Sequence, residues 1–399
     1  MTGQVEMFLK EISGSSHANE PFSDDAQSLR ETYQAGGVIF RKALPGDNEK
    51  LKVALRDNAL DSWVRLSLER EPSYFDGEAL MGKSFAVMAC DENQPDSMVG
   101  MYSCAFLPVH VNGVSKYVGY LGGLRVNQQY RHKVRILKSG FVSIKYLVPN
   151  LGASPFMFTS VASENTHARR LLEAGLKGMP VYRPLGDMET LAFNTKQGKL
   201  QGLLQQAVLQ DVPALVDFFN RQAARYQFSP VLTKEWLLSL SGKKGLSLGD
   251  FWLAKDGTNI RGCLAIWDQR AFKQTMSRGY RFPINVFRGA YNLFAGATGR
   301  VKLPAPGNAL EQVYLSFVAF DNFAGAFPIQ VVREGLAHAR EKGAEVGILG
   351  VSAENPLAVI LKRTLKSSVY RTCIETVTWP GDLKPILNGC PVQPEVAVL

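Results

Sequence analysis

The sequence predicts an α/β protein built from two similar domains in tandem. Its 399 residues exceed one ordinary domain, since domains commonly hold about 100–200 residues. Strand-like and helix-like hydrophobic patterns alternate along the chain, and short patterns of the first half return in the same order in the second. We expect a weakly ordered leader at 1–37, domains at 38–197 and 202–380, and a tail at 381–399.

The first half shows a regular succession of elements. Apolar and β-branched runs predict strands at 37–43, 85–90, 98–111, 117–126, 156–162 and 189–193. Helical spacing predicts helices at 26–34, 49–60, 136–146 and 165–173. The pair Asn112-Gly113 is typical of a tight hairpin turn.

Three patterns of the first half recur about 190 residues later. They are Val161-x-x-Glu164-Asn165-x-x-Ala168 with Val351-x-x-Glu354-Asn355-x-x-Ala358, Val181-Tyr182-Arg183 with Val369-Tyr370-Arg371, and Glu189-Thr190 with Glu375-Thr376. Matches in one order with slowly changing offsets indicate two diverged copies. Residues 195–201 form the predicted linker, and 284–306 form an insertion in the second copy that begins with a helix.

The composition is that of a globular protein with moderate positive charge. Lys and Arg number 45 against 36 Asp and Glu, for a net charge of +9. This fits either an ordinary surface or an anionic partner such as nucleic acid, membrane or a phosphorylated cofactor. Five dispersed cysteines predict neither disulfides nor a metal site. Without a signal-peptide pattern or an apolar run of about 18 residues, we expect a soluble cytoplasmic protein with no membrane partner.

The segment 117–141 is the most informative for function. A strand is predicted to end at Val126, a polar loop follows, and a helix begins near Ile136. Free amides at a helix start, together with the helix dipole, form an anion site. The basic residues of this segment are Arg125, Arg131, Lys133, Arg135 and Lys138. The alternative interpretation of this segment is a basic loop that is simply exposed to solvent. With few aromatic residues nearby, a nucleic-acid surface is not expected.

The run Leu124-Arg125-Val126-x-x-x-Tyr130-Arg131-x-Lys133 resembles the core motif of the GNAT superfamily of N-acetyltransferases. In that family a fourth strand leads into a loop of pattern Gln/Arg-x-x-Gly-x-Gly/Ala, which wraps the pyrophosphate of acetyl-coenzyme A. The segment 161–172 resembles the next motif, a fifth strand followed by Asn and a helix. The resemblance covers 38–193 and, less closely, 202–380. It implies two tandem GNAT-like domains, each with a mixed sheet.

The resemblance also implies a set of cofactor-binding residues. Backbone groups of Leu124 and Val126 would pair with the pantetheine arm of acetyl-CoA or another acyl-CoA. The pyrophosphate would be held by the loop of Arg131, His132, Lys133, Val134, Arg135 and Ile136. Asn165 would hydrogen-bond the cofactor where the two strands separate, or would cap the following helix, a position that Asn favours.

The sequence departs from the family at several points. Val134 and Ile136 stand where the loop normally has glycine or alanine, and the second copy has Asp321 and no Arg or Lys in its loop, so its site is degenerate. The tyrosine that often serves as general acid is replaced by Leu172 and Lys362. The catalytic residues therefore stay unknown. The candidates are Tyr120, Glu164 and Tyr182, each of which also has a purely structural interpretation.

Together these features predict an N-acyltransferase without a metal. It would transfer an acetyl or other acyl group from acyl-coenzyme A to an amine of a small molecule or protein, by direct attack of the amine. The alternative is a GNAT-like domain that binds acyl-coenzyme A without catalysis, as a sensor or an interaction module.

Overall fold

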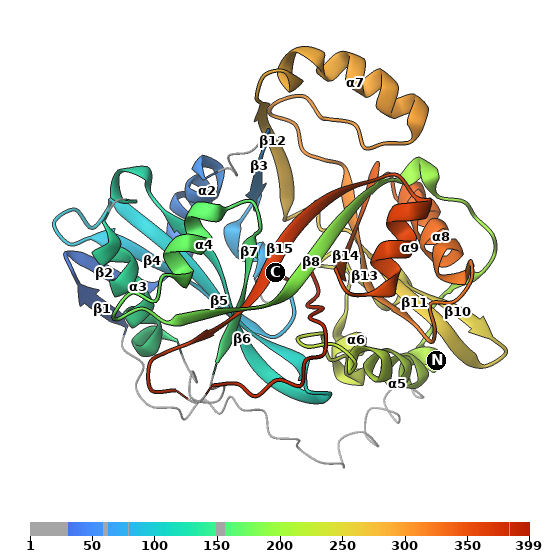
Figure 1. Cartoon of the computed structure of the whole chain (residues 1–399), viewed down its shortest axis with the longest axis horizontal. Helices are drawn as coiled ribbons and strands as arrows, with labels where there is room; N and C mark the ends of the chain where they lie inside the picture. The colour runs from blue at the N-terminus through green and yellow to red at the C-terminus, as the bar shows by residue number, and fades with distance from the viewer. Residues whose placement is uncertain (1–30, 59–62, 79, 132, 149–155, 383) are drawn as a thin grey trace.

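A mixed sheet of thirteen strands runs through both halves of the chain (Figure 1). The computed structural model describes residues 31–58, 63–78, 80–131, 133–148, 156–382 and 384–399. The strands of the first half are β1 (Thr32–Ala35), β2 (Val38–Lys42), β3 (Val64–Glu69), β4 (Lys83–Asp91), β5 (Met98–Val111), β6 (Val114–Val126), β7 (Met157–Ala162) and β8 (Val181–Asn194). Those of the second half are β9 (Leu204–Gln206), β10 (Phe251–Asp256), β11 (Asn259–Trp267), β12 (Gln274–Tyr280), β13 (Gln312–Phe320), β14 (Val346–Ser352) and β15 (Ser367–Thr378).

The order within the large sheet is β1-β2-β4-β5-β6-β7-β15-β8-β14-β13-β11-β10-β9. The remaining strands, β3 and β12, pair with each other in a separate two-stranded sheet. The large sheet contains parallel pairs, β6 with β7 and β13 with β14, among antiparallel ones. The predicted α/β class with a mixed sheet is therefore confirmed.

Helices pack on the sheet in both halves. They are α2 (Asn48–Asp57), α3 (Val134–Leu147), α4 (Thr166–Glu173), α5 (Val212–Ala223), α6 (Lys234–Ser239), α7 (Ile284–Thr298), α8 (Phe327–Glu341) and α9 (Pro356–Thr364). The apolar sides of α3 and α4 form a core with the first-half strands through Phe141 and Leu172. Those of α8 and α9 do the same in the second half through Leu336 and Leu361. Within the described ranges, no helix is both long and apolar enough to cross a membrane.

Most of the locally predicted elements are confirmed, with one correction. Asn112 and Gly113 join β5 to β6 with φ of 54° and 80°, as a tight hairpin requires. The helix predicted at 26–34 is wrong over its described end, because residues 32–35 form strand β1. Tyr33 stacks on Tyr146 of α3, with ring centroids 4.8 Å apart. Pairing with β2 and this tertiary contact decide the structure there. Residues 26–30 lie outside the described part.

The last strand of each half lies in the other half's part of the sheet. β15 pairs with β7 over residues 372–377, and β8 pairs with β14 over residues 188–194. β8 and β15 also pair with each other, and Figure 1 shows them side by side across the centre of the molecule. Each half therefore completes the sheet of the other. Removing either half would leave an unpaired strand edge in the remaining one.

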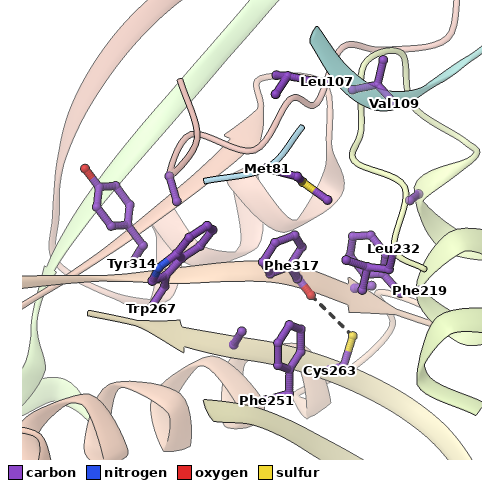
Figure 2. Packing of buried hydrophobic residues seen from close by; sticks show 14 of the residues in the cluster. Met81, Leu107, Val109, Phe219, Leu232, Phe251, Cys263, Trp267, Tyr314 and Phe317 are labelled. Carbon is purple, nitrogen blue, oxygen red and sulfur yellow. Dashed lines mark hydrogen bonds between the residues drawn. The ribbon is translucent and has the colours of Figure 1, made fainter. Parts of the chain in front are cut away.

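A third core joins the two halves on the opposite side of the sheet from α3 and α4. It contains Leu107 and Phe158 from the first half and Trp267 and Phe317 from the second. Figure 2 shows side chains of both halves around Phe317. Phe158 stacks on Phe228 at 4.5 Å between ring centroids. Burial of large aromatic side chains from both copies binds them into one body.

A buried glutamate on β8 is fully paired. Glu189 accepts hydrogen bonds from Lys362 of α9 and from Arg371 of β15. Burial by itself would raise the pKa of Glu189, but these two cations reverse the effect and lower it. The carboxylate therefore stays charged and links α9 to the two exchanged strands.

The matching glutamate on β15 has no such partner. Glu375 is completely buried, and within the described residues neither carboxylate oxygen has a hydrogen-bond partner. Arg169 of α4 lies 3.9 Å away. Burial and the neighbouring Glu173 raise the pKa of Glu375 to about 7. The sequence repeat explains the difference, because Leu172 on α4 takes the place that Lys362 has on α9.

We predict that Glu375 makes stability fall as the pH rises. A carboxyl group whose pKa is raised by folding is favourable while protonated. Its contribution is complete below the ordinary pKa near 4.5 and is lost as the pH rises through about 7. The loss is on the order of 3 kcal/mol. Glu375→Gln should match the wild type near pH 4, below both pKa values, and be more stable near pH 8, measured by urea unfolding.

The matched control is Glu189→Gln. The pKa of Glu189 is lowered, so its ion pairs are complete at neutral pH. This variant should be less stable than the wild type near pH 8, because Lys362 and Arg371 lose their common partner. Equal pH dependence in the wild type and in Glu375→Gln would contradict the role given to Glu375.

Candidate functional site

Strands β6 and β7 separate after two paired positions. The parallel ladder joins Gly119 to Met157 and Tyr120 to Phe158, and ends there. The hydroxyl of Thr159 donates to the carbonyl of Leu121 at 2.6 Å and closes the vertex. Beyond it, residues 121–126 of β6 diverge from residues 159–162 of β7. We call the space between these two segments the first slot.

The second half repeats this geometry. β13 and β14 pair from Gln312 with Val346 to Tyr314 with Ile348, and then separate. We call the space between residues 315–320 and 349–352 the second slot. Tyr120 and Tyr314 thus hold the same place at the vertex. Burial raises the pKa of each of these tyrosines to about 12.

A β-bulge lies three residues beyond the vertex in both copies. Gly123 has φ +62° and interrupts the pairing of β6 with β5, while Phe317 has φ +52° and interrupts the pairing of β13 with β11. Glycine adopts this conformation freely, but phenylalanine does so only when its surroundings hold it. The bulge turns one main-chain amide out of the ladder. Leu124 and Val126 therefore correspond to Val318 and Phe320.

The first slot ends near the start of α3. Lys133 is the N-cap residue of α3, and the first turn of the helix carries no acidic residue. The amide of Ile136 donates to the Lys133 carbonyl at 2.9 Å, whereas no described residue accepts from the amides of Val134 and Arg135. The Ile136 side chain is buried in the core beneath α3, and Val134 is 38% exposed. The bulky side chain of Ile136 thus lies in the core.

The basic side chains of the loop contact its own frame. Arg131 donates from Nε to the Val126 carbonyl at 3.1 Å, and its guanidinium also reaches Asn58. The ammonium group of Lys133 lies 4.8 Å from the ring centroid of Tyr130. These contacts fix the turn between β6 and α3 while leaving positive charge beside the helix start. His132 lies outside the described residues.

The two repeated asparagines are helix caps. Asn165 Oδ1 accepts from the Ala168 amide at 3.1 Å, and Asn355 Oδ1 accepts from the Leu357 amide at 2.9 Å. The capping interpretation of Asn165 is confirmed, and its Nδ2 group stays available for a second role. In the second copy that role is filled, because Asn355 Nδ2 donates to Gln393 Oε1 at 2.8 Å.

The tail of the chain occupies the second slot. A carboxylate oxygen of Glu395 accepts from the bulge amide of Phe317 at 2.9 Å, and the other accepts from the Ala397 amide at 3.1 Å. Val396 packs so closely on Gly350 that a Cβ there would lie 2.3 Å from it. Residues 393–396 therefore lie against both β13 and β14. This position is set by tertiary contacts that the sequence analysis did not predict.

A half-buried lysine holds the end of the tail. Lys273 donates to the main-chain oxygens of Ala397 and Leu399 at 3.2 and 3.0 Å, and Gln269 donates to Ala397 at 2.9 Å. Burial lowers the pKa of Lys273 to about 7, although the carboxylate of Glu395 partly opposes this. Residues that precede β12 thus position the tail.

A half-buried arginine faces the first slot without a carboxylate partner. Arg125 donates to the Leu124 carbonyl at 2.9 Å, but its Nε has no hydrogen-bond partner among the described residues. Burial lowers the pKa of Arg125, while the nearby phenols of Tyr74, Tyr120 and Tyr370 act in the opposite direction. We call these four residues the arginine–tyrosine cluster. An incompletely paired buried cation favours an anionic ligand or a developing negative charge.

The three acid–base candidates lie in different surroundings. Tyr120 is buried at the vertex, and Glu164 is exposed between β7 and α4. Tyr182 is part of the core beneath α3, where its ring meets Phe141 edge-on at 5.9 Å and burial raises its pKa well above the ordinary value. Its surroundings favour the structural interpretation. In the sequence, Tyr370 stands out only as part of the repeated Val-Tyr-Arg pattern. No local pattern indicates that strand exchange brings it to the first slot.

In sequence comparisons, no protein family and no curated protein matches this chain. Solved structures do match. N-myristoyltransferase of Saccharomyces cerevisiae with bound myristoyl-CoA has a TM-score of 0.58 and 12% identity, covering 94% of this chain and 93% of its own. A GCN5-related N-acetyltransferase from Sphaerobacter thermophilus has a TM-score of 0.53 and 15% identity, covering 88% of this chain and 99% of its own.

These likenesses extend over both halves of the chain. The chain shares its fold with the yeast N-myristoyltransferase and with the GCN5-related N-acetyltransferase. The predicted relation to GNAT proteins is thereby confirmed at the level of the fold. The low sequence identity leaves the reaction to be argued from the site.

We predict that Glu395→Ala weakens the attachment of the tail. The buried amide of Phe317 would lose its acceptor at a backbone position that needs support, at a cost of about 1–3 kcal/mol in the free energy of unfolding. Glu395→Gln keeps an oxygen acceptor and should lose less. Urea unfolding of both variants tests this. An alanine variant as stable as the wild type would show that this contact does not hold the tail.

Proposed function

We propose that this chain is an N-acyltransferase that binds an acyl-coenzyme A in the first slot and transfers its acyl group to an amine. One observation carries the proposal. Two equivalent slots exist, and only the first ends at a helix start with a basic loop. In the second slot the tail already binds the bulge amide of Phe317 and the side-chain amide of Asn355. A helix start without acidic residues suits a diphosphate.

The contents of the second slot support this assignment. There, Asn355 Nδ2 binds the amide oxygen of Gln393, and the bulge amide of Phe317 binds a carboxylate oxygen. A pantetheine arm also carries amide oxygens, and a tetrahedral intermediate carries an oxyanion. The corresponding donors of the first slot are Asn165 Nδ2 and the amide of Gly123. In the second slot, the tail thus presents the same kinds of acceptor oxygen that an acyl-coenzyme A would present in the first slot.

The proposal retains most of the residues that the sequence predicted. Main-chain groups of Leu124 and Val126 would pair with the pantetheine arm, and Asn165 would donate to it. The pyrophosphate would be held by the main-chain amides of Val134 and Arg135 at the start of α3 and by the charges of Arg131, Lys133 and Arg135. The amide of Ile136 already donates to the Lys133 carbonyl. His132 belongs to this set from the sequence alone.

The chemistry is a direct displacement. The nitrogen of a neutral amine attacks the thioester carbon and forms the C–N bond, while the carbonyl electron pair moves to oxygen. The Gly123 amide would stabilise that oxyanion. Collapse of the intermediate breaks the C–S bond and releases coenzyme A as a thiolate, and the nitrogen loses its proton to water or a base. Arg125 lies beside this path and would favour the developing negative charge.

A non-catalytic acyl-coenzyme A sensor is the second candidate. It is favoured by one observation: Leu172, at the place of the usual tyrosine acid, is buried in the core beneath α4. Binding without turnover would support it. The two functions share the first slot and differ only in the release of coenzyme A.

We predict that acetyl-coenzyme A or a longer acyl-coenzyme A stabilises the protein with a stoichiometry of one per chain. At 100 times the dissociation constant, the gain is about 2.7 kcal/mol in the free energy of unfolding. Thermal unfolding and titration calorimetry measure the two quantities. Two sites per chain would contradict the assignment of the cofactor to the first slot alone, and no shift with any chain length would end the proposal.

Removing charge at the loop should weaken this binding. The double variant Lys133→Ala/Arg135→Ala is expected to lose about tenfold or more in affinity for acyl-coenzyme A, since charge-assisted contacts to phosphate contribute about 1.5–3 kcal/mol each. Lys234→Ala/Lys243→Ala removes two exposed lysines at α6 and is the matched control. Equal loss in both variants would mean that only net charge matters.

Arg125→Met should separate binding from catalysis. We expect the rate of coenzyme A release with an amine acceptor to fall by about 10²–10³-fold, with a smaller change in the affinity for acyl-coenzyme A. Arg125→Lys should restore part of the rate. Arg363→Met, on the exposed side of α9, is the control. Unchanged turnover in Arg125→Met would remove this residue from the mechanism.

A further inference from the structure

Helix α7 turns its polar side chains toward the protein. Asn292 exchanges two hydrogen bonds with the main chain of Leu303, at 2.9 and 2.8 Å. Arg288 also donates to the Leu303 carbonyl, and the hydroxyl of Tyr291 donates to the Val301 carbonyl at 3.2 Å. Ala295 is completely buried on the same side. The polar side of α7 is thus hydrogen-bonded to the segment 301–303, which follows the helix.

The opposite side of α7 is apolar and exposed. The exposed fractions are 64% for Val286, 60% for Phe287, 79% for Leu293 and 55% for Phe294. Val286 and Leu293 are seven residues apart, as are Phe287 and Phe294, and Ala290 lies three or four residues from each of them. This spacing places them on one stripe of the helix. The alanines of this stripe, Ala290 and Ala297, are exposed as well. A helix that faces water normally has the reverse arrangement, so this stripe requires an apolar neighbour outside the chain.

The helix is also held away from the body of the protein. It follows β12, which pairs with β3, and Figure 1 shows it at the top of the molecule beyond this two-stranded sheet. Two further aromatic side chains are exposed at its base, Phe282 at 73% and Trp63 at 60%. The Arg281 amide donates to the Trp63 carbonyl at 3.0 Å, which keeps these residues together.

The segment around α7 is rich in basic residues, of which Arg270 and Arg278 are ion-paired with Asp268 and Glu69. Residues 269–310 contain seven basic residues and no Asp or Glu. Arg300 and Lys302 follow α7 directly, and the Arg300 guanidinium lies 6.0 Å from the ring centroid of Phe294. Apolar and aromatic side chains flanked by cations are the pattern of helices that lie in the interface of an anionic bilayer.

We propose that α7 docks this protein on the surface of a membrane that carries anionic lipid. The helix has 15 residues, too few to span a bilayer, so it would lie in the interface plane with its apolar stripe among the acyl chains. Trp63 and Phe282 would enter the headgroup layer, and Arg300 and Lys302 would face lipid phosphates. The sequence analysis expected no membrane partner, but that expectation concerned membrane spans and signal peptides, not surface contact.

Flotation of the full chain with vesicles tests the proposal. Vesicles of phosphatidylcholine with phosphatidylglycerol are compared with vesicles of phosphatidylcholine alone. We expect binding to the anionic vesicles, weakened by salt. Val286→Ser/Phe287→Ser/Leu293→Ser/Phe294→Ser should reduce the partition coefficient by about tenfold or more. Arg300→Gln/Lys302→Gln should reduce it specifically on the anionic vesicles.

The matched control replaces four exposed apolar residues elsewhere, Leu200→Ser/Val208→Ser/Leu209→Ser/Ile386→Ser, and should bind vesicles like the wild type. Equal vesicle binding by the α7 variant would overturn the proposal. So would a wild type that ignores vesicles but forms a dimer that the α7 variant abolishes in light scattering, because a second copy would then cover the stripe. The acyl-coenzyme A shift in thermal unfolding should persist in the α7 variant, which separates this test from the proposed function.

Discussion

The exchange of β8 and β15 is the constraint on which the rest of the structure depends. Each half lacks the strand that would finish its own sheet and receives it from the other. Pairing of main-chain groups along both strands is obligatory once they are buried. The exchange therefore fixes the relative position of the copies and brings Tyr370 to the first slot. The shared aromatic core around Phe158 and Phe317 follows from that position.

The two copies share the same backbone geometry but differ in the hydrogen-bond partners of their equivalent polar groups. Vertex, bulge and capped helix recur in both. In the second copy the bulge residue is Phe317, whose unusual backbone angle is supported by Glu395, and Asp321 at the end of β13 is paired with Arg261. In the first copy glycine makes the same angle without support. The polar donors of the second slot are thus bonded to the tail, whereas the first slot has cationic surroundings.

Local sequence patterns predicted the elements well and their long-range arrangement poorly. The strand at 98–111 and the Asn112-Gly113 hairpin were predicted because period-two alternation and turn chemistry are local. The strand at 32–35 was predicted as a helix because its contact with Tyr146 is distant in sequence. The strand exchange depends on pairings between residues more than a hundred positions apart, and the tail reaches the second slot through contacts 38 and 78 positions apart. Neither has a local signal.

The same reasoning applies to the bulky residues of the loop. Glycine is expected in a phosphate loop because a side chain would block the approach of the ligand to the main chain. That argument assumes that the side chain points to the ligand. At Ile136 the side chain belongs to the core beneath α3, since the helix begins two residues earlier, at Val134. A branched residue there packs into the core and would not face an anion bound at the helix start. A substitution in a motif therefore has to be judged by the direction of the side chain, which depends on where the helix begins.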